Sequence, residues 1–565
     1  MSGLNMTLDI AKGGMQAQQT ALTVIGHNIV NVNSPGFSKQ TVLMVPNTAL
    51  PSDVGLLGSG VSVDSITRAY SKYIQSQLSG EIEGFGKWEA KRETLDQIEA
   101  IFNESADYGL NNAMNEFWNS WQDVANNPTG QAERITLISK GATLVNILND
   151  QHTNLSQIQD GLNNTIGNTL EDINTMADQI AELNQKILGA ESGGCQANDY
   201  RDERLNLVND LSALINVNYF ETSDGSLTIM VGEGKSLVEG ISSWDLEGEV
   251  NIGNNGFIDV TWNPGGTSSN VNISNDITGG KLAGWLDLRD TTIDDYLDKL
   301  NTLAGKIIEE VNRLHSDGVG LSGYSSITAA NAVSDTGVAL ENADLPFTPV
   351  DGSFDVYVYD SSGTITDSGT ITIDADVTTL NNVDTQIDGI NNITASINNG
   401  QLTITADNGY TFSFLNDDSD ALPALGLNTF FTGSDASTIA INPVVEDDVS
   451  MIAAATSTNS PGDNTNALAI ADLENSLLLG NGTYTFNDYY NSLVSEIGME
   501  SQNASSMSSH QELMVEQMEN QRSSVSGVSL DEEMVNLIKY QNAYVASTRL
   551  VSLIDELLQT LVEMV

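Results

Sequence analysis

The segment VGEGKS at 231–236 is the motif of this chain that most resembles a phosphate-binding loop. A complete loop of that kind has a glycine five residues before Gly234, and Ile229 stands there instead. A helix should also follow the loop, yet the surrounding residues alternate in the manner of strands. We therefore interpret VGEGKS as the turn of a β-hairpin and assign it no phosphate chemistry.

Metal ligation and nucleophilic catalysis need clusters of histidine, cysteine or carboxylate at short spacings. The four histidines are His27, His152, His315 and His510; none lies at a metal-ligand spacing from another, and no HExxH motif occurs. We expect each to be a polar residue of a helix face or a loop. Cys195, within ESGGCQAND, has no nearby histidine to activate it and is expected in a flexible connector.

The acidic segment NDDSD at 416–420 could hold calcium, but it lacks the glycine and the distal glutamate of an EF-hand loop. An acidic turn is the simpler interpretation. Carboxylates are so numerous elsewhere that any chosen catalytic pair would be uninformative. We therefore predict no catalytic, metal-binding or cofactor-binding residues, and no enzyme activity.

The charge balance excludes some classes of partner. The chain has 565 residues, which suggests three to four domains, and 76 acids against 21 bases give a net charge of −55. Such a field repels phosphate, so nucleic acid and anionic membranes are not expected partners. Between Arg313 and Arg522 there is no Lys or Arg, although runs of Val, Ile, Thr and Phe predict that this acidic region folds.

The N-terminal residues and the apolar stretches bear on targeting. The N-terminus lacks the basic and apolar regions of a cleaved secretory signal, and no stretch approaches 18 consecutive apolar residues. We expect no membrane insertion. A cytoplasmic location would follow only if export required a cleaved signal.

Both ends of the chain carry apolar side chains at steps of three and four residues, the heptad pattern of helices that pair along a seam. The simplest arrangement pairs the first helix with the last, although each could dock separately on an internal core. A two-helix unit of this length is marginal alone in water, so we expect copies or partners to complete it. The residues predicted to form this assembly interface are Leu4, Leu8, Met15, Leu22, Ile25 and Ile29, with Leu530, Met534, Leu537, Tyr544, Val551, Ile554, Leu558 and Leu561.

The first helix is predicted to end at HNIVNVNSPGFSKQ, residues 27–40. The sequence from Ser34 to Phe37 fits a type II turn, because proline fixes the first central φ and glycine supplies the positive second φ. We expect the asparagines of this corner, Asn33 included, to satisfy backbone and neighbouring groups. The motif residues are Asn28, Asn31, Ser34, Pro35, Gly36 and Phe37.

Between the ends, helical and strand-like periods alternate: helix, β, helix, β, helix. The predicted fold is α+β and multidomain, with coiled-coil-like paired terminal helices, a long helical-bundle trunk and two inserted β-rich modules. The expected boundaries are 1–50 with 522–565 for the terminal domain, 51–215 with 279–325 and 455–521 for the trunk, and 216–278 and 326–454 for the β-rich insertions.

Several segments of the sequence resemble those of a known protein family. LTVIGHNIVNVNSPGFSKQ resembles the N-terminal signature of the flagellar axial proteins, the family of rod, hook and hook-associated proteins, and SGVSLDEEMVNLIKYQNAYVASTRL is similar to their C-terminal helix. NEFWNSWQDVANNPTGQAERITLISKGATL, NDYRDERLNLVNDLS and LGLNTFFTGSDASTIAINPVV narrow the resemblance to the hook-associated branch. Ser34, where Thr is commoner, and Val30, where Ala is usual, are mild departures.

The resemblance implies a structural component of the bacterial flagellum at the junction between hook and filament, which enables filament assembly. It implies a ring-like homo-oligomer, with the hook protein and a second junction protein as axial neighbours. It also implies an extracellular location, reached through the flagellar type III apparatus without a cleaved signal. A dedicated export chaperone would hold the C-terminal segment before export.

Two alternatives remain open. The chain could be another axial protein, such as a hook or distal rod protein, but those generally lack a long helical trunk like residues 65–215. It could also be an acidic surface adhesin or hydrolase, which the lack of a credible catalytic set disfavours.

Overall fold

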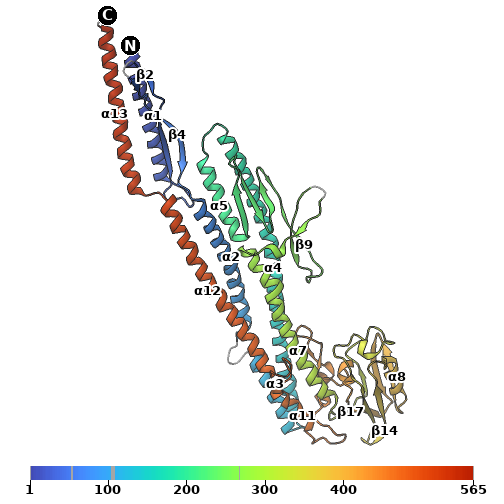
Figure 1. Ribbon diagram of the computed structural model, residues 1–565. Coiled ribbons are helices and arrows are strands. Elements are labelled where there is room, and N and C mark those ends of the chain that lie inside the picture. The colour runs from blue at the N-terminus through green and yellow to red at the C-terminus, as the bar shows by residue number, and fades with distance from the viewer. Residues whose placement is uncertain (1, 53–54, 104–108, 266–267, 564–565) are drawn as a thin grey trace. The chain divides into compact units, whose positions relative to one another are not determined.

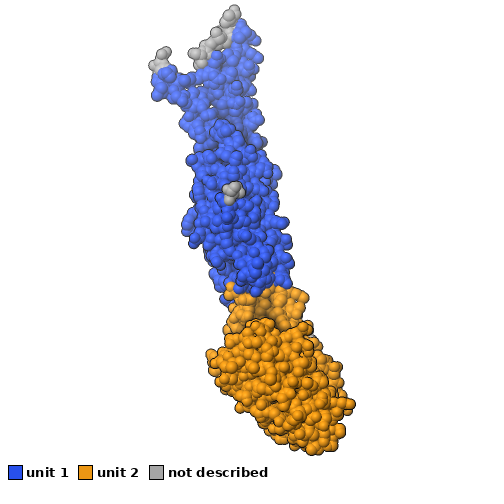
Figure 2. Space-filling view, turned by 90° about the vertical axis from the view of Figure 1, so that its right-hand side faces the viewer, with its two compact units in different colours: residues 1–94, 160–290, 502–565 blue, residues 95–159, 291–501 orange. Residues whose placement is uncertain are grey.

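The computed structural model describes residues 2–52, 55–103, 109–265 and 268–563. They form two compact units, coloured separately in Figure 2. Unit 1 comprises residues 1–94, 160–290 and 502–565, and unit 2 comprises residues 95–159 and 291–501. The predicted α+β class is confirmed, whereas the finer division into four domains stays a prediction.

The two ends of the chain meet in unit 1. Helix α1 (Ser2–Val30) packs against α13 (Leu530–Glu563) and also against strands β1 (Gln40–Pro46) and β4 (Val61–Arg68) (Figure 1). The antiparallel β1–β4 pair continues into β2 (Leu50–Ser52) and β3 (Gly55–Leu57), so that residues 40–52 and 55–68 form the two arms of one long hairpin. We call residues 2–68 and 530–563 the terminal module.

The rest of unit 1 is a helical bundle with a β-rich part. Ile166, Ile173, Ala177 and Ile180 lie on one face of the 61-residue helix α4 and are buried against α5 and the sheet. The hairpin predicted around VGEGKS is confirmed, because residues 232–234 connect two antiparallel strands. The helices are α2 (Lys72–Ile101), α4 (Gln131–Glu191), α5 (Asn198–Leu214), α6 (Gly280–Asp287) and α12 (Phe486–Ser526), of which α2, α4 and α12 also contribute residues to unit 2.

Two small sheets belong to this β-rich part. Their orders are β5-β6-β7-β8 and β11-β10-β9. The strands are β5 (Val217–Glu221), β6 (Leu227–Val231), β7 (Lys235–Glu239), β8 (Ser242–Ser243), β9 (Leu246–Val250), β10 (Ile258–Trp262) and β11 (Val271–Asn272).

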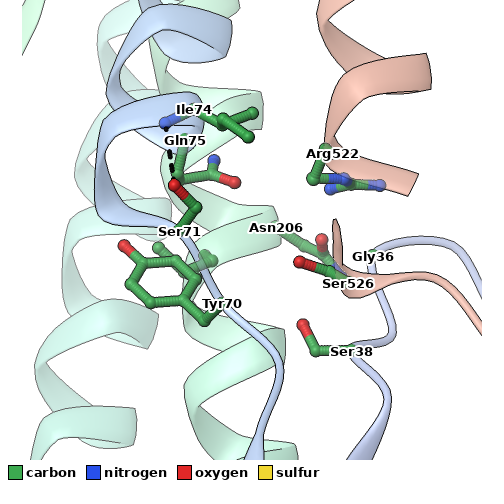
Figure 3. A pocket seen from close by; sticks show the side chains of 10 residues that line it. Gly36, Ser38, Tyr70, Ser71, Ile74, Gln75, Asn206, Arg522 and Ser526 are labelled. Atoms are coloured by element: carbon green, nitrogen blue, oxygen red, sulfur yellow. Dashed lines mark hydrogen bonds between the residues drawn. The ribbon is translucent and has the colours of Figure 1, made fainter. Parts of the chain in front are cut away.

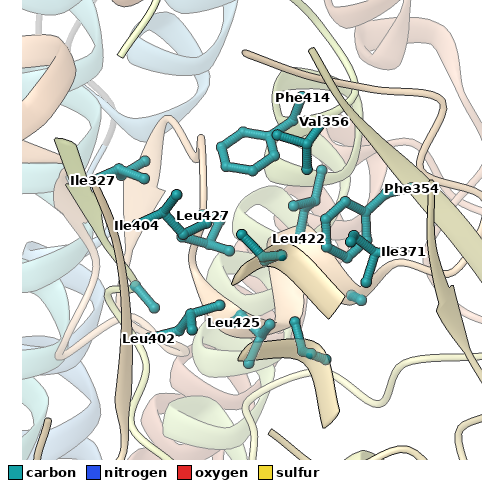
Figure 4. Close-up of a cluster of buried hydrophobic side chains, with 14 of the residues drawn as sticks. Ile327, Phe354, Val356, Ile371, Leu402, Ile404, Phe414, Leu422, Leu425 and Leu427 are labelled. Carbon is teal, nitrogen blue, oxygen red and sulfur yellow. The ribbon is translucent and has the colours of Figure 1, made fainter. Parts of the chain in front are cut away.

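Unit 2 joins helices to a second β-rich part. Two three-stranded sheets, β14-β13-β17 and β12-β16-β15, contribute side chains to one buried cluster that includes Phe354, Ile404, Phe414 and Leu422 (Figure 4). The helical stretch from Gly280 to Ser316, in the predicted trunk, is interrupted, since residues Leu288–Thr292 form a π-helical turn between α6 and α7.

The strands of unit 2 are β12 (Ser326–Thr328), β13 (Gly352–Asp360), β14 (Ile365–Ile373), β15 (Ile393–Asn398), β16 (Gln401–Ala406), β17 (Tyr410–Leu415), β18 (Phe431–Thr432) and β19 (Ala440–Ile441). Its helices, besides those shared with unit 1, are α3 (Leu110–Asn126), α7 (Ile293–Ser316), α8 (Leu380–Asp388), α9 (Ala421–Leu425), α10 (Pro443–Asp447) and α11 (Thr465–Ala471).

Candidate assembly module at the chain ends

Helices α1 and α13 are antiparallel, and two contacts fix their register. The Asn28 amide donates to Glu533 at 3.0 Å, and a Cβ placed on Gly14 would lie 3.3 Å from the Ser547 Oγ. The second contact lies two heptads earlier on α1 and two heptads later on α13 than the first, as expected for antiparallel helices. The predicted pairing of the first helix with the last is confirmed, and the absence of a side chain at Gly14 permits the close approach.

Helix α1 is the middle layer of the terminal module. Ala11, Ala17 and Ala21 are buried, and Gly13 faces the β4 side, where an added Cβ would lie 3.1 Å from the Val61 carbonyl oxygen. Figure 1 shows α13 on one side of α1 and the hairpin on the other. Because α1 is covered on two sides, small residues as well as the predicted leucines form its buried surface.

The face of α13 that turns inward differs from the predicted stripe in its first turns. Leu530 and Met534 are 49% and 53% exposed, because Glu533 takes the inward position and bonds to Asn28 and Lys39. The inward side chains, buried or half-buried at steps of four and three, are Glu533, Leu537, Tyr540, Tyr544, Ser547, Val551, Ile554 and Leu558.

The other predicted interface residues are covered to different degrees. Ile25 and Ile554 are buried, and the Leu561 side chain lies outside the described residues. The assignment of the whole set to an assembly interface stays a prediction. The half-buried members are Leu4, Leu8, Met15, Leu22, Ile29, Leu537, Tyr544, Val551 and Leu558.

The predicted turn follows α1 directly. The Phe37 N–H donates to the Ser34 carbonyl at 3.2 Å and Gly36 has φ +74°, which confirms the type II turn after Pro35. A Cβ on Gly36 would lie 1.8 Å from Asn206 Oδ1, so glycine is required by both backbone and space. Asn206 on α5 in turn donates to the Pro35 carbonyl at 3.3 Å.

Two of the asparagines of this corner, Asn28 and Asn31, bond as predicted, whereas the role expected of the exposed Asn33 stays a prediction. Asn31 donates to the His27 carbonyl at 3.0 Å and accepts from the Ser34 hydroxyl at 3.1 Å. Asn28 donates to the Gln40 carbonyl at 2.9 Å and accepts from the Gln40 N–H at 3.0 Å. The backbone groups at the end of α1 and the start of β1 are therefore satisfied by side chains of the motif.

Polar contacts from several elements secure the chain just after the turn. Asp202 on α5 accepts from the backbone and hydroxyl of Ser38 at 2.8 and 2.9 Å and from Arg68 at 2.6 Å. The Lys39 N–H donates to the Ser526 carbonyl at 2.7 Å, at the end of α12. These bonds join the terminal module to α5 and α12.

A small pocket lies at this meeting point. The turn, the start of α2, α5 and the end of α12 line it (Figure 3). Its volume of about 10 Å³ holds about one water molecule. Burial raises the pKa of Tyr70 to about 12, so this side chain stays neutral. The pocket is a packing gap and is too small for an organic ligand.

The acidic segment NDDSD lies at a turn, and Cys195 lies in a connector. In NDDSD, Asp417 accepts from the Ser419 and Leu422 N–H groups at 3.0 and 2.9 Å and so holds the start of α9. Cys195 is exposed in the predicted connector between α4 and α5. Within the described ranges, no three His, Cys, Asp or Glu side chains are placed to hold a metal ion.

One histidine departs from expectation. His315 is fully buried in unit 2 rather than on a polar face: its Nε2 accepts from the Ala453 N–H at 3.0 Å, and Nδ1 lies 2.7 Å from the Asn428 carbonyl. This arrangement requires the neutral ring with a proton on Nδ1, and burial lowers the pKa to about 4. A lone histidine in an amphipathic helix gives no sequence signal of burial, because loops more than 100 residues away supply its partners.

The lengths and compositions of the helices bear on the expectation of no membrane insertion. In the part of the chain that the structure describes, no helix is both long and apolar enough to span a bilayer. Together, these observations direct attention from catalysis to the terminal module.

Comparisons with known proteins place the chain among flagellar proteins. The family described as "Flagellar hook-associated protein FlgK helical domain" matches residues 95–328. "Flagella basal body rod protein" matches residues 8–37, which contain the turn motif, and "Flagellar basal body rod FlgEFG protein C-terminal" matches residues 519–564, which contain α13.

Relatives that match over nearly their whole length are also flagellar proteins. Flagellar hook-associated protein 1 of Escherichia coli is 28% identical over 99% of this chain and 100% of its own length. The Bacillus subtilis protein of the same name is 26% identical over 100% and 98%, and the Salmonella typhimurium protein 27% identical over 99% of each.

A solved structure shares the fold. The flagellar hook junction protein FlgK from Burkholderia pseudomallei matches 80% of this chain and 100% of its own with a TM-score of 0.56 at 18% identity. Over its whole length the chain is therefore similar to flagellar hook-associated protein 1, and the comparisons support a structural protein at the hook–filament junction of the bacterial flagellum, a family whose members assemble with other flagellar components.

Proposed function

We propose that the terminal module is the surface through which this chain assembles into a ring between the hook and the filament. The observation that carries the proposal is an uncovered apolar face on α13. Its exposed residues are Met534, Val535, Ile538, Val545, Leu550, Leu553 and Leu557, each between 43% and 66% exposed. At 100° per residue they lie on roughly the opposite side of the helix from the residues that face inward.

The charge distribution supports self-assembly through this module. Residues 1–68 and 530–565 contain five Lys or Arg and nine Asp or Glu, a net charge of −4, which leaves −51 of the chain's −55 for the other residues. Surfaces that must meet copies of themselves lose free energy to like-charge repulsion. A nearly neutral module on a strongly acidic chain removes this penalty where copies would touch.

In this proposal the four predicted domains have different tasks. The terminal domain, 1–50 with 522–565, forms the inner layer, the helical trunk surrounds it, and the two β-rich insertions project outward. The axial neighbours are the hook protein and the second junction protein. The chain holds these neighbours together mechanically and performs no catalysis.

Export and chaperoning form the last part of the proposal. The chain leaves the cell through the flagellar type III apparatus without a cleaved signal, and it acts outside the cell. Before export, a dedicated chaperone covers the C-terminal segment, since the apolar face of α13 would otherwise promote aggregation.

The test uses a strain that lacks the gene, complemented with variants and viewed by electron microscopy. Ile538→Asp with Leu553→Asp should leave a folded trunk but give hooks without filaments, with filament protein released into the medium. Leu22→Asp with Ile29→Asp should give the same result by breaking the helix pair.

The matched control is Val250→Asp with Ile252→Asp, which changes two exposed apolar residues of the β-rich part of unit 1 and should preserve filaments. Normal filaments with the α13 double variant, in cells that contain and export it, would refute the proposal.

A further inference from the structure

The last paired residues of the long hairpin, Leu50–Ser52 and Gly55–Leu57, which we call its tip, carry apolar side chains that the described part of the chain leaves largely exposed. Leu50, Leu56 and Leu57 are 50%, 75% and 43% exposed, and Leu43, beside the bulge of β1, is 49% exposed. Leu50 pairs with Leu57 across the strands, while Leu56 pairs with Pro51 and so faces the other side. The tip therefore exposes apolar surface on both faces.

A two-stranded hairpin with both faces exposed has little stability of its own in water. The middle of this hairpin is supported, since Gly60 packs against Ile10 of α1, where an added Cβ would lie 3.3 Å from the Ile10 Cα. The Asn47 N–H donates to the Gly60 carbonyl at 2.9 Å, and Ser59 donates to the Thr48 carbonyl at 2.6 Å, so the two strands stay paired toward the tip. The tip is thus held out with its leucines uncovered.

We infer that this tip docks on the outer face of α13 of a second copy of the chain. The inference rests on the proposed function, because it names the contact by which terminal modules join. The two uncovered apolar surfaces of the module lie on opposite sides of α1, with α13 on one side and the hairpin on the other (Figure 1). A copy cannot bring its own surfaces together, but each surface can meet the complementary surface of a neighbour.

The charges of the two surfaces permit this contact. Between residues 40 and 63 the only charged residue is Asp53, so the hairpin brings almost no charge to an acidic neighbour. A second copy fits the tip better than a basic partner would, because the tip offers no row of carboxylates to such a partner. A contact between two different surfaces of identical subunits is heterologous, and it closes into a ring when the rotation permits.

The register of the module selects the site on α13. Gly60 lies at the level of Ile10, and the antiparallel pairing that sets Gly14 beside Ser547 brings this level of α1 to the C-terminal half of α13. The strands run on from Gly60 past the start of α1, so in a ring of copies at equal height the tip of one copy faces the last turns of α13 of the next, from Leu557 onward.

The test introduces a photo-crosslinking amino acid at position 56 of the full-length chain, in flagella isolated from the complemented deletion strain. Irradiation should give a product of twice the chain mass. Trypsin cleaves after Arg549, so the captured peptide should be 550–565. Probes at positions 252 and 538 serve as controls: the first is on a loop residue 91% exposed in the β-rich part of unit 1, and the second is on the outer face of α13.

Each outcome decides the inference. Capture of peptide 550–565 from a second copy at position 56, with none at position 252, supports it. Three results at position 56 would overturn the inference and leave the proposed function standing. The first is capture of hook, filament or chaperone protein, and the second is capture of another peptide of this chain. The third is no capture at all while position 538 does cross-link. Failure of position 538 to capture any axial protein contradicts the proposed function itself.

A pair of substitutions gives an independent readout. Leu56→Glu with Leu57→Glu should reduce the number of filaments per cell at least tenfold, with unchanged thermal unfolding of the purified chain because both side chains are exposed. Normal filament numbers would overturn the inference even if cross-linking succeeded.

Discussion

The side-chain amide of Asn28 on α1 donates a hydrogen bond of 3.0 Å to Oε2 of Glu533 on α13, and both residues are buried although 505 positions separate them. Asn28 also exchanges two hydrogen bonds with the backbone of Gln40. Glu533 lies 3.3 Å from the Lys39 ammonium. One asparagine therefore connects the end of the first helix, the first strand and the start of the last helix.

Asn28→Ala should loosen the start of α13. It leaves the Gln40 backbone groups with fewer partners in a buried site, at a cost of about 1–3 kcal/mol for each unsatisfied group. Hydrogen exchange measured by mass spectrometry should be faster in peptides that cover residues 530–547. Asn33→Ala, on the exposed part of the same corner, is the control and should leave the hydrogen exchange of these peptides unchanged. Equal exchange rates in the two variants would contradict the role of Asn28.

Gly36→Ala should destabilise unit 1 for two separable reasons. The positive φ costs a non-glycine residue about 1–2 kcal/mol, and the new Cβ would collide with Asn206. Adding Asn206→Ala should recover the collision part only, as measured by thermal unfolding. Gly26→Ala is the matched control, since a Cβ there meets nothing within 4 Å in a helix and should stabilise it by about 0.5–1 kcal/mol. Complete recovery by the double variant would show that the turn tolerates alanine.

His315 should make unit 2 less stable in acid. Its pKa is lowered to about 4 by burial, whereas in the unfolded chain it is near 6.5. The unfolded state binds the proton first, so the contribution is complete above pH 6.5 and is lost as pH falls toward 4, by about 3 kcal/mol in total. Urea unfolding followed by tryptophan fluorescence should show this loss, because Trp121 lies against His315.

The non-titrating variant His315→Gln isolates the effect. It should be less stable than the parent at pH 7, and the difference between the two should shrink as pH falls to 4. A constant difference across this range would show that His315 titrates normally or not at all.

Glu83 on α2 should make unit 1 less stable as pH rises, which is opposite to the effect of His315 on unit 2. Burial raises its pKa to about 7, although the Val217 N–H, 2.9 Å from Oε1, favours the charged form. The folded state therefore holds a proton that the unfolded state releases near pH 4.5. This contribution is complete below pH 4.5 and is lost as pH rises through 7.

Glu83→Gln removes the titration while keeping the size of the side chain. Relative to the parent, the variant should gain stability between pH 5 and pH 8, as measured by the midpoint of thermal unfolding of the full chain. Parallel profiles for the two proteins would refute the raised pKa.

The amino-acid sequence determined much that depends on local residue order. The apolar steps at both ends, the Pro35–Gly36 pair and the alternation of helical and strand-like periods predicted the paired end helices, the type II turn and the α+β class, all of which the structure confirms. These features depend on backbone geometry and periodicity, which neighbouring residues set.

Only the tertiary structure decided which side chains fill each surface. An apolar stripe shows that α13 buries a face, but Glu533 rather than Met534 points inward because its partners, Asn28 and Lys39, lie about 500 positions away in sequence. In the same way, loops beyond residue 420 bury His315, and the hairpin covers α1 on the side opposite α13. Periodicity within a segment carries no information on such distant hydrogen bonds and close approaches, so the sequence determined the elements and the tertiary contacts determined their faces.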